Sequence, residues 1–380
     1  MKEKTTTLIL LFFVIPFLVK SQNLPKDTIY GKIKRIREKV IFLTEIENPQ
    51  LLYNSDYGHE GFMGSESTIS RFYDIWFSTY FCYYINFERF YTPNQKIKKE
   101  NWYSKNNSFM LSYSYVYDKK DRVISKIDSS ANSIETENHY FEEYGDYVDE
   151  NIIHENLRRN LFSHDYIKYK NGKIITKKNY NYNGSVKEYR YHYNKNGTLD
   201  YRVYKNPSTW KKLEGNSYSY GVQDSIGITY KDLIYEYDTK NQLTKTRLFD
   251  LDSDRHINEV IQIKQTLNIY EGDNLITKYT SNNYRSENYF NFSYNNSKQL
   301  VAKYCCGKDI SNATVIEKYN YKNNMISQLT YEEEDFETKK MKKYIVSYSY
   351  KYDQYKNWIE IIKTVDGKDL YKWKREIEYY

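Results

Sequence analysis

The sequence has few cysteines, which can cross-link a fold, and few prolines and glycines, which interrupt regular secondary structure. Its 380 residues include 3 Cys, 5 Pro and 14 Gly. A disulfide needs separated, facing Cβ atoms, so the adjacent Cys305 and Cys306 are not expected to bond to each other. Cys82 could pair with either of them, and the sequence does not choose between the two. Three thiols therefore exclude a disulfide framework.

Long apolar segments are lacking after the N-terminus. Residues 8–19 form an apolar run of 12 that follows Lys2 and Lys4, an arrangement typical of a secretory signal. A membrane span needs roughly 20 apolar residues, and Pro16 interrupts this run. We expect residues 1–21 to be a signal peptide cleaved after Ser21, with no stable membrane span afterwards. The expected location is extracytoplasmic: the periplasm, the outer-membrane surface or the medium.

Neither sign of charge dominates the chain. It has 57 Lys and Arg against 50 Asp and Glu, a formal net charge of +7. Lys2, Lys4, Lys20 and Glu3 account for +2 of this, so the mature chain carries +5. Mixed charge indicates a solvated surface, and no nucleic-acid partner is expected. The densest basic run, KIKRIREK at residues 32–39, is interpreted as an exposed face.

Aromatic residues are abundant: 46 Tyr, 17 Phe and 5 Trp. The mean hydropathy of −0.88 would indicate disorder if the polar residues were massed together, but here they are interleaved with rings. Because an aromatic side chain buries on the order of 150–250 Å², tyrosine can build a core in place of leucine.

The tyrosines recur in a unit of Tyr-x-Tyr-Asp/Asn, a polar turn and an apolar residue. Clear copies are YSYVYDKKDRV, YRYHYNKNGTL, YEYDTKNQL, YFNFSYNNSKQL and YSYKYDQYKNW. The tyrosines before the turns are Tyr91, Tyr117, Tyr144, Tyr169, Tyr193, Tyr237, Tyr270, Tyr294, Tyr321 and Tyr352. Their spacing of about 25 residues indicates a repeat architecture. The longest step contains Pro207, and we expect an insertion around residues 205–230 there.

Each repeat is predicted to be a β-hairpin. Tyr348, Tyr350 and Tyr352 alternate with polar residues, as in a strand, and Asn183-Gly184 is a strong hairpin signal. Strands in register would stack their tyrosines across the sheet, each pair worth about 0.2–1 kcal/mol. We expect the rings to line an inner face and join successive hairpins, with their hydroxyls reaching water at the rim.

The turn residues have a chemical role. The Asp or Asn after the last tyrosine can bind the backbone two residues on and so start the turn. Four residues after that tyrosine, a positive φ is expected, which Gly, Asn and Asp tolerate best. Gly197, Asn241 and Asp121 fit this requirement. Lys298 and Lys356 do not, so their turns are expected to take another form.

These units resemble the YD repeats of bacterial RHS-like proteins, whose pattern is Tyr-Asp-x-x-Gly-Asn/Arg-Leu/Trp. The resemblance covers roughly residues 90–380 and is carried by the units that begin at Tyr117, Tyr193, Tyr237 and Tyr352, of which one keeps the family glycine, Gly197. It implies an RHS-like exported protein, short and without a toxin domain. The family's repeats carry no catalytic residues.

Residues 22–90 differ from the repeats. The segment RFYDIWFSTYFCYYINFERFY, residues 71–91, is continuously aromatic without a clean period. It could form one or two buried strands or a helix laid over the end of the sheet. Since an open array exposes edge strands that invite aggregation, we interpret residues 22–90 as an N-terminal cap. An aromatic ligand pocket is the alternative.

No residues are predicted to be catalytic, cofactor-binding or metal-binding, and no cofactor is expected. The six histidines (59, 139, 154, 164, 192 and 256) form no metal-binding motif. His59 and Glu60 are neighbours in a loop, which does not make a catalytic pair. DLDSDRHINE, which begins at Asp250, imitates a calcium loop, but Arg255 replaces its glycine and Ile261 its final glutamate. A solvated hairpin tip is favoured.

The sequence thus predicts an all-β protein: a long antiparallel meander of repeated hairpins, roughly 20 strands, in a strongly twisted or curled sheet. Three functions stay open. The first is an exported, non-catalytic scaffold that binds an extracellular glycan or surface protein. The second is a hydrolase acting on extracellular polysaccharide, whose carboxylates would meet only in the fold. The third is a purely structural envelope component.

Overall fold

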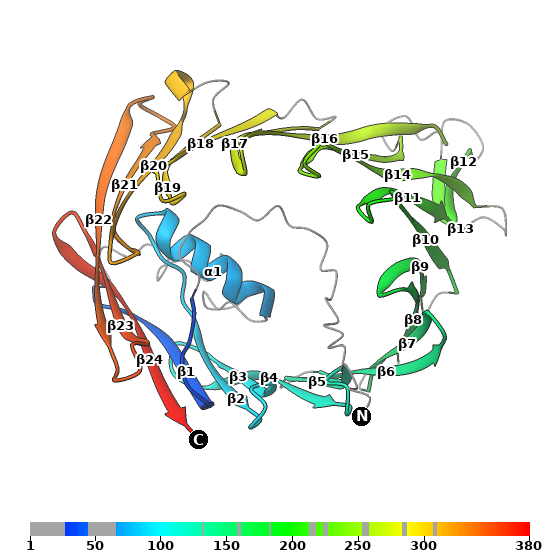
Figure 1. Cartoon of the computed structure of the whole chain (residues 1–380), viewed down its shortest axis with the longest axis horizontal. Coiled ribbons are helices and arrows are strands. Elements are labelled where there is room, and N and C mark those ends of the chain that lie inside the picture. The colour runs from blue at the N-terminus through cyan, green and yellow to red at the C-terminus, as the bar shows by residue number, and fades with distance from the viewer. Residues whose placement is uncertain are drawn as a thin grey trace, which may run out of the picture.

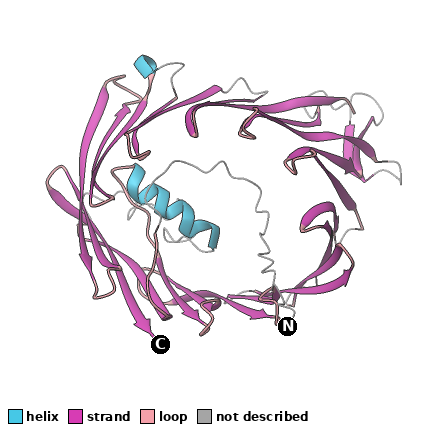
Figure 2. Ribbon diagram, viewed as in Figure 1, coloured by secondary structure: helices cyan, strands magenta, loops and turns pink. Residues whose placement is uncertain are grey.

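The computed structural model describes residues 27–44, 66–130, 133–157, 161–181, 184–212, 218–222, 227–252, 258–282, 287–306 and 310–380. Within these ranges the chain is almost entirely β-structure, with α1 and the short η2 as the helices (Figure 2). The first elements are β1 (Ile33–Phe42), α1 (Glu66–Ser78), β2 (Asn86–Tyr91), β3 (Ile97–Tyr103), β4 (Phe109–Tyr117), β5 (Val123–Ser130), β6 (Ile134–Tyr144), β7 (Tyr147–Asn156) and β8 (Leu161–Lys170).

The remaining elements continue the same hairpin pattern. They are β9 (Lys173–Tyr180), β10 (Val186–Tyr193), β11 (Leu199–Asn206), β12 (Ser208–Lys212), β13 (Tyr218–Val222), β14 (Ile228–Tyr237), β15 (Leu243–Leu251), β16 (Val260–Glu271), β17 (Asn274–Asn282), β18 (Glu287–Tyr294), β19 (Leu300–Cys305), η2 (Ile310–Asn312), β20 (Val315–Lys322), β21 (Met325–Glu334), β22 (Met341–Tyr352), β23 (Trp358–Val365) and β24 (Lys368–Tyr379). The predicted all-β antiparallel meander is confirmed.

The sheet closes on itself, contrary to the expectation of an open, curled array. Twenty-two strands form one sheet in which chain neighbours pair antiparallel. β1 pairs with β2 on one side and with β24 on the other, which completes a ring (Figure 1). Closure removes edge strands, so the described sheet has no end for an N-terminal cap to cover. The expectation of an open sheet was wrong because β24, the strand that closes the sheet against β1, lies more than 300 residues away in sequence.

The closing strand β1 comes from the basic run that we interpreted as an exposed face. Arg35, Arg37 and Lys39 do lie on one side of β1, but Ile36 and Val40 are buried on the other. Glu38 is buried with them and accepts hydrogen bonds from Trp373 Nε1 at 2.8 Å and Arg375 Nε at 2.9 Å. This buried ion pair joins the first strand to the last.

Helix α1 lies inside the ring, near β1 and β19–β24 (Figure 1). Phe72 and Trp76 are fully buried, and the Phe72 ring meets that of Trp373 edge to face with centroids 4.9 Å apart. The Tyr348 hydroxyl donates to the carbonyl of Trp76 at 3.0 Å. The aromatic segment 71–91 therefore forms both a helix and a strand, β2, and its helix packs on the inner face of the sheet.

Contact with α1 identifies the inner face on β22–β24. From there the pairing registers carry the assignment from strand to strand, because directly opposed residues share a face and neighbours along a strand alternate. By this rule Lys126, Glu137, His154 and Ser163 are inner residues, and Ile127, Thr136, Glu155 and Phe162 are outer residues.

The sheet bypasses the segment where we expected an insertion. β11 pairs directly with β14, and the chain between them contributes β12 and β13, which form a separate two-stranded sheet. Pro207 lies between β11 and β12, outside the main sheet. Its lack of an N–H group therefore removes no hydrogen bond from that sheet.

All five clear repeat units use the same turn. The φ angles at Asp121, Gly197 and Asn241 are 62°, 88° and 62°, as predicted. Lys298 and Lys356 have φ of 59° and 67°, so the expectation of another turn form for them was wrong. In each turn the Asp or Asn N–H bonds the carbonyl four residues on; Asp118 N to Arg122 O, at 2.9 Å, is an example. Tolerating a left-handed lysine requires the surrounding hydrogen bonds to outweigh its steric cost of roughly 1–2 kcal/mol.

Several tyrosine hydroxyls bind backbone carbonyls, contrary to the expectation that they reach water. Seven repeat tyrosines donate to the backbone carbonyl of the apolar residue that follows the preceding unit's turn. We call these contacts the tyrosine latches: Tyr117 to Ile97, Tyr193 to Ile174, Tyr237 to Leu199, Tyr270 to Leu243, Tyr294 to Leu275, Tyr321 to Leu300 and Tyr350 to Ile326, at 2.6–3.1 Å. The latches explain why the repeats use tyrosine and not phenylalanine.

Ring stacking across strands is present as predicted, but on both faces of the sheet. Tyr189 and Tyr204 stack on the inner face with centroids 4.8 Å apart. Tyr279 and Tyr289 face each other on the outer side at 4.5 Å. The tyrosine rows are thus not confined to the inner face.

The cysteines differ from expectation. Cys305 and Cys306, adjacent in the chain, are bonded to each other, and Cys82 is a buried free thiol in the same core cluster as Phe72 and Trp76. Neither of the two pairings considered for Cys82 is formed. Cys306, the residue after β19, has a φ of 68°.

Candidate functional site

The most chemically distinctive part of the described chain is a row of charged side chains on the inner face of β5–β9, across the ring from α1 (Figure 1). It begins with an alternation on β6, where Glu135, Glu137 and His139 occupy every second position and so share one face. The registers set Glu137 opposite Lys126 on β5 and His154 on β7. Three consecutive strands thereby supply one polar surface.

His139 is clamped between two carboxylates. Its Nδ1 lies 2.7 Å from Glu150 Oε1 and its Nε2 lies 2.8 Å from Glu137 Oε1. Burial alone lowers the pKa of His139, but the hydrogen bonds to Glu137 and Glu150 outweigh it and raise the pKa to about 9. The imidazole is therefore positively charged at neutral pH and donates from both nitrogens. The bond from His139 also lowers the pKa of Glu137.

The network extends on both sides of this clamp. The Tyr169 hydroxyl donates to Glu150 Oε2 at 2.6 Å. His154 lies 3.6 Å from Glu137 and 3.8 Å from Asp165. Burial raises the pKa of Asp165, but His154, Asn179 and Lys177 together lower it to about 2. Carboxylates and nitrogen bases thus alternate along the inner face from β6 to β9.

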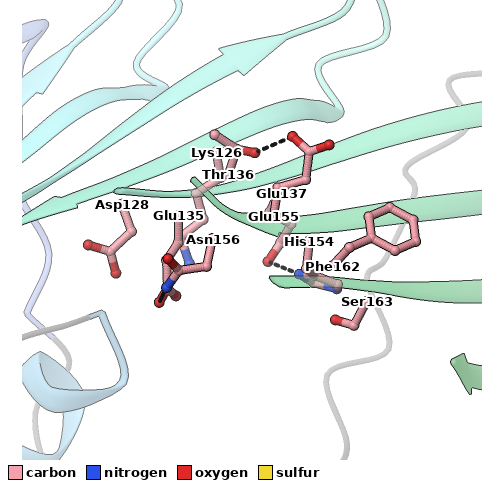
Figure 3. A pocket seen from close by; sticks show the side chains of 10 residues that line it. All are labelled: Lys126, Asp128, Glu135, Thr136, Glu137, His154, Glu155, Asn156, Phe162 and Ser163. Atoms are coloured by element: carbon pink, nitrogen blue, oxygen red, sulfur yellow. Dashed lines mark hydrogen bonds and ion pairs between the residues drawn. The ribbon is translucent and has the colours of Figure 1, made fainter. Parts of the chain in front are cut away.

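A pocket of about 320 Å³ opens at one end of this network. Figure 3 shows Asp128, Glu135, Asn156 and His154 projecting from the same side of the strands. The full lining is Lys126, Asp128, Glu135, Thr136, Glu137, His154, Glu155, Asn156, Phe162 and Ser163. By the register, the side chains of Thr136, Glu155 and Phe162 point to the outer face. The volume is at the lower end of the roughly 300–1,000 Å³ range of ligand sites, which suits one sugar-sized group.

Two carboxyl groups of the pocket face each other across β5 and β6. Asp128 is directly opposite Glu135 in the register. Glu135 Oε1 accepts hydrogen bonds from Asn156 Nδ2 at 2.9 Å and Ser133 Oγ at 3.2 Å, which fix its orientation. Burial, with the nearby charge of Glu135, raises the pKa of Asp128. Glu135 is thus held as a hydrogen-bond acceptor, and burial favours the protonated form of Asp128.

The donor set does not suit a metal ion. Among the described residues no group of three or more His, Cys, Asp or Glu side chains is arranged to hold one. The carboxylates that could serve are already bound to His139, Lys177 and Asn156. The polar groups that line the pocket can donate hydrogen bonds to a polar ligand and accept hydrogen bonds from it.

The residues that the sequence drew attention to lie elsewhere. His59, Glu60, Arg255 and His256 are outside the described residues. Asp250, the first acid of the calcium-like segment, is the penultimate residue of β15 and accepts a hydrogen bond from the Tyr230 hydroxyl at 2.8 Å. His164 and His192 are on the outer face, where they stack on Tyr180 and Tyr201 at 5.1 and 4.3 Å.

Sequence reasoning missed the role of His139 and His154 because it searched for metal-binding spacings. The alternation of two acids and a histidine in ETENH, residues 135–139, carried the signal, since a strand places these three side chains on one face. Their partners Glu150, His154 and Asp165 follow only from the register of β6, β7 and β8.

No protein-family model and no curated protein matches the chain. Among solved structures it is similar to the Photorhabdus luminescens Tc holotoxin pore, with 10% identity and a TM-score of 0.35 over 75% of this chain and 16% of that one. It is also similar to a porin-like protein from Bacteroides uniformis, with 7% identity and a TM-score of 0.26 over 92% of this chain and 100% of that one. Within the described residues, no helix has both the length and the apolarity needed to cross a membrane.

Proposed function

We propose that this protein is an exported, non-catalytic binding shell of a bacterial envelope, built from YD-like repeats, and that its inner-face pocket binds a glycan. The observation that carries the proposal is the pocket between β5 and β8. It gathers carboxylate, amide, hydroxyl, imidazole and ammonium groups around a volume that fits one sugar unit. Glycans present hydroxyl groups that both donate and accept, so a mixed lining of this kind suits them.

The interior network supports binding more than chemistry. Glu137 and Glu150 are held by His139, and Glu135 by Asn156 and Ser133. Side chains fixed by such bonds lose little further freedom when a ligand arrives, which favours affinity. The five turns of identical form support the YD-like assignment, and the expected signal peptide supports export.

The test is retention of the mature chain, residues 22–380, on a panel of insoluble polysaccharides, followed by titration with soluble oligosaccharides of any retained glycan. Glu135→Gln and Asn156→Ala should each weaken binding about tenfold, equal to about 1.4 kcal/mol. The control is Glu332→Gln, which removes an outer-face carboxylate on β21 opposite Lys343. Retention of no glycan would favour a purely structural envelope component; binding that both variants leave intact would place the site elsewhere.

A second candidate function, polysaccharide hydrolysis, is favoured by the Asp128–Glu135 pair. Directly opposed residues have Cβ atoms roughly 4.5–5.5 Å apart, and glycosidases use two carboxyl groups about 5–10 Å apart, one of them with a raised pKa. Release of reducing ends from a bound polysaccharide, abolished by Asp128→Asn, would establish hydrolysis. A binding shell predicts no release from any polysaccharide that it retains.

A further inference from the structure

The outer face of the sheet on β8–β11 and β14 has a charge opposite to that of the inner pocket. We call it the basic outer face and define it by Lys168, Lys170, Lys178, Arg190, Lys205 and Lys231. The registers place all six on the side of the sheet that faces away from the interior. At the described outer positions of the same strands the carboxylates are Glu188 and Glu236. A net positive surface results.

Most of these cations are not neutralised within the described chain. Glu188 pairs with Arg190 at 2.7 Å and approaches Lys178 at 4.0 Å, and Glu236 pairs with Arg247 on β15 at 2.7 Å. Among described residues, no carboxylate oxygen is within 4.0 Å of the ammonium groups of Lys168, Lys170, Lys205 or Lys231. Two of them nevertheless have a carboxylate residue directly opposite on the neighbouring strand, Asp149 for Lys168 and Glu188 for Lys205. Because none of these carboxylates is within ion-pair distance, the four lysines remain available to an anionic partner.

Aromatic rings lie between the cations. The Lys168 ammonium is 5.3 Å from the ring centre of Tyr144 and 5.2 Å from that of Tyr147. The Lys231 ammonium is 3.9 Å from the centre of Tyr201, whose ring also stacks on His192. The rings hold the lysine side chains in place over the sheet.

The cations are regularly spaced. Directly opposed residues form a row across five neighbouring strands. In order from β8 to β14, the row is Lys168, Thr176, Arg190, Val203 and Lys231. One straight row across the sheet thus carries a cation on every second strand. Because neighbouring strands are about 4.8 Å apart, the cations repeat roughly every 10 Å. A second row, through Lys178 and Lys205, has the same two-strand period.

We propose that the basic outer face binds a linear acidic polysaccharide that carries one carboxylate per disaccharide. The two-strand spacing is about the length of a disaccharide, so successive carboxylates can meet Lys168, Arg190 and Lys231. A nucleic acid is a poorer fit, since its phosphates follow at about 3.4 Å per strand. This site is independent of the inner pocket and does not depend on its function.

The experiment measures binding of the mature chain to hyaluronan, which has one carboxylate per disaccharide, by isothermal titration calorimetry at two salt concentrations. Carboxyl-reduced hyaluronan, oligothymidylate and phosphatidylglycerol vesicles are the comparison probes. The triple variant Lys168→Gln, Arg190→Gln, Lys231→Gln should weaken hyaluronan binding at least tenfold and flatten its salt dependence. The matched control changes the same charge on β20 and β22: Lys318→Gln, Lys322→Gln, Lys343→Gln should alter affinity less than twofold.

The triple variant Lys168→Arg, Arg190→Lys, Lys231→Arg keeps the charge and should retain binding, which separates loss of charge from loss of fold. Absence of hyaluronan binding, equal loss in both glutamine variants, or equal binding of the carboxyl-reduced polymer would overturn the proposal. Tighter binding of oligothymidylate or of the vesicles would also overturn it, in favour of those partners. Glu135→Gln, in the inner pocket, should leave hyaluronan binding unchanged.

Discussion

The hydroxyl of Tyr321 donates a hydrogen bond to the carbonyl oxygen of Leu300 at 2.7 Å, across the boundary between two repeats. Six other repeat tyrosines make the same contact with the preceding unit. Each ring therefore contributes burial within the sheet and a specific bond along the chain of repeats. A closed sheet of this size has to hold its register over many hairpins, and the tyrosine latches do so at regular intervals.

Removing one hydroxyl should be measurable. Tyr321→Phe should lower the free energy of unfolding by about 1–3 kcal/mol, because the carbonyl of Leu300 loses its partner in a buried site. Tyr352→Phe is the control, since Tyr352 is 48% exposed and makes no latch. Urea unfolding followed by far-ultraviolet circular dichroism provides the measurement, and equal midpoints for the two variants would contradict a stabilising role of the latch.

Replacing the two lysines that have a positive φ, Lys298 and Lys356, by glycine should stabilise the protein. Lys298→Gly and Lys356→Gly relieve a positive φ, so each should raise the free energy of unfolding by about 1 kcal/mol. Lys240→Gly, in the equivalent turn after β14 but outside the positive-φ position, should lower or leave it unchanged. The same urea titrations report the difference, and destabilisation by Lys298→Gly would show that its side chain contributes more than its backbone strain costs.

The hydrogen bonds of Glu137 and Glu150 to His139 should stabilise the protein at pH values below the pKa of His139. Its folded pKa of about 9 lies above the ordinary value of 6.5, so its contribution is fully present below about pH 6.5 and is lost as the pH rises through about 9. The stability difference between wild type and His139→Gln should therefore shrink between pH 6.5 and pH 9.5. His192→Gln, on the outer face, is the control. A difference that grows over this range would refute the charged clamp.

Lys363 should show the opposite dependence. It is fully buried under α1 and donates to the carbonyls of Trp76 at 2.9 Å and Phe81 at 2.8 Å. Burial lowers its pKa from 10.5 to about 7, so the charged form is disfavoured in the fold. Wild-type stability relative to Lys363→Met should rise from pH 7 to pH 10.5. Thermal unfolding across this range measures it, and a flat difference would mean that the ammonium is solvated.

The local parts of this fold were predictable. Tyr348, Tyr350 and Tyr352 alternate as a strand requires, and Asp118 and Asp238 start turns through bonds to the backbone two residues on, at 2.8 Å each. These features depend on neighbours within a few residues, so they can be read directly from the sequence. Even so, Lys298 and Lys356 adopt the positive φ that residue propensity alone argues against.

By itself, the sequence determined the strands, the turns and the repeat, because alternation and turn chemistry act over a few bonds. The tertiary structure alone decided three things: that β1 closes the sheet against β24, that α1 packs inside the ring, and that Glu137, His154 and Asp165 meet across β6–β8. The physical reason is register. Which residues face one another across strands, and which strand meets the first one hundreds of residues later, depends on how all the hairpins add up in space.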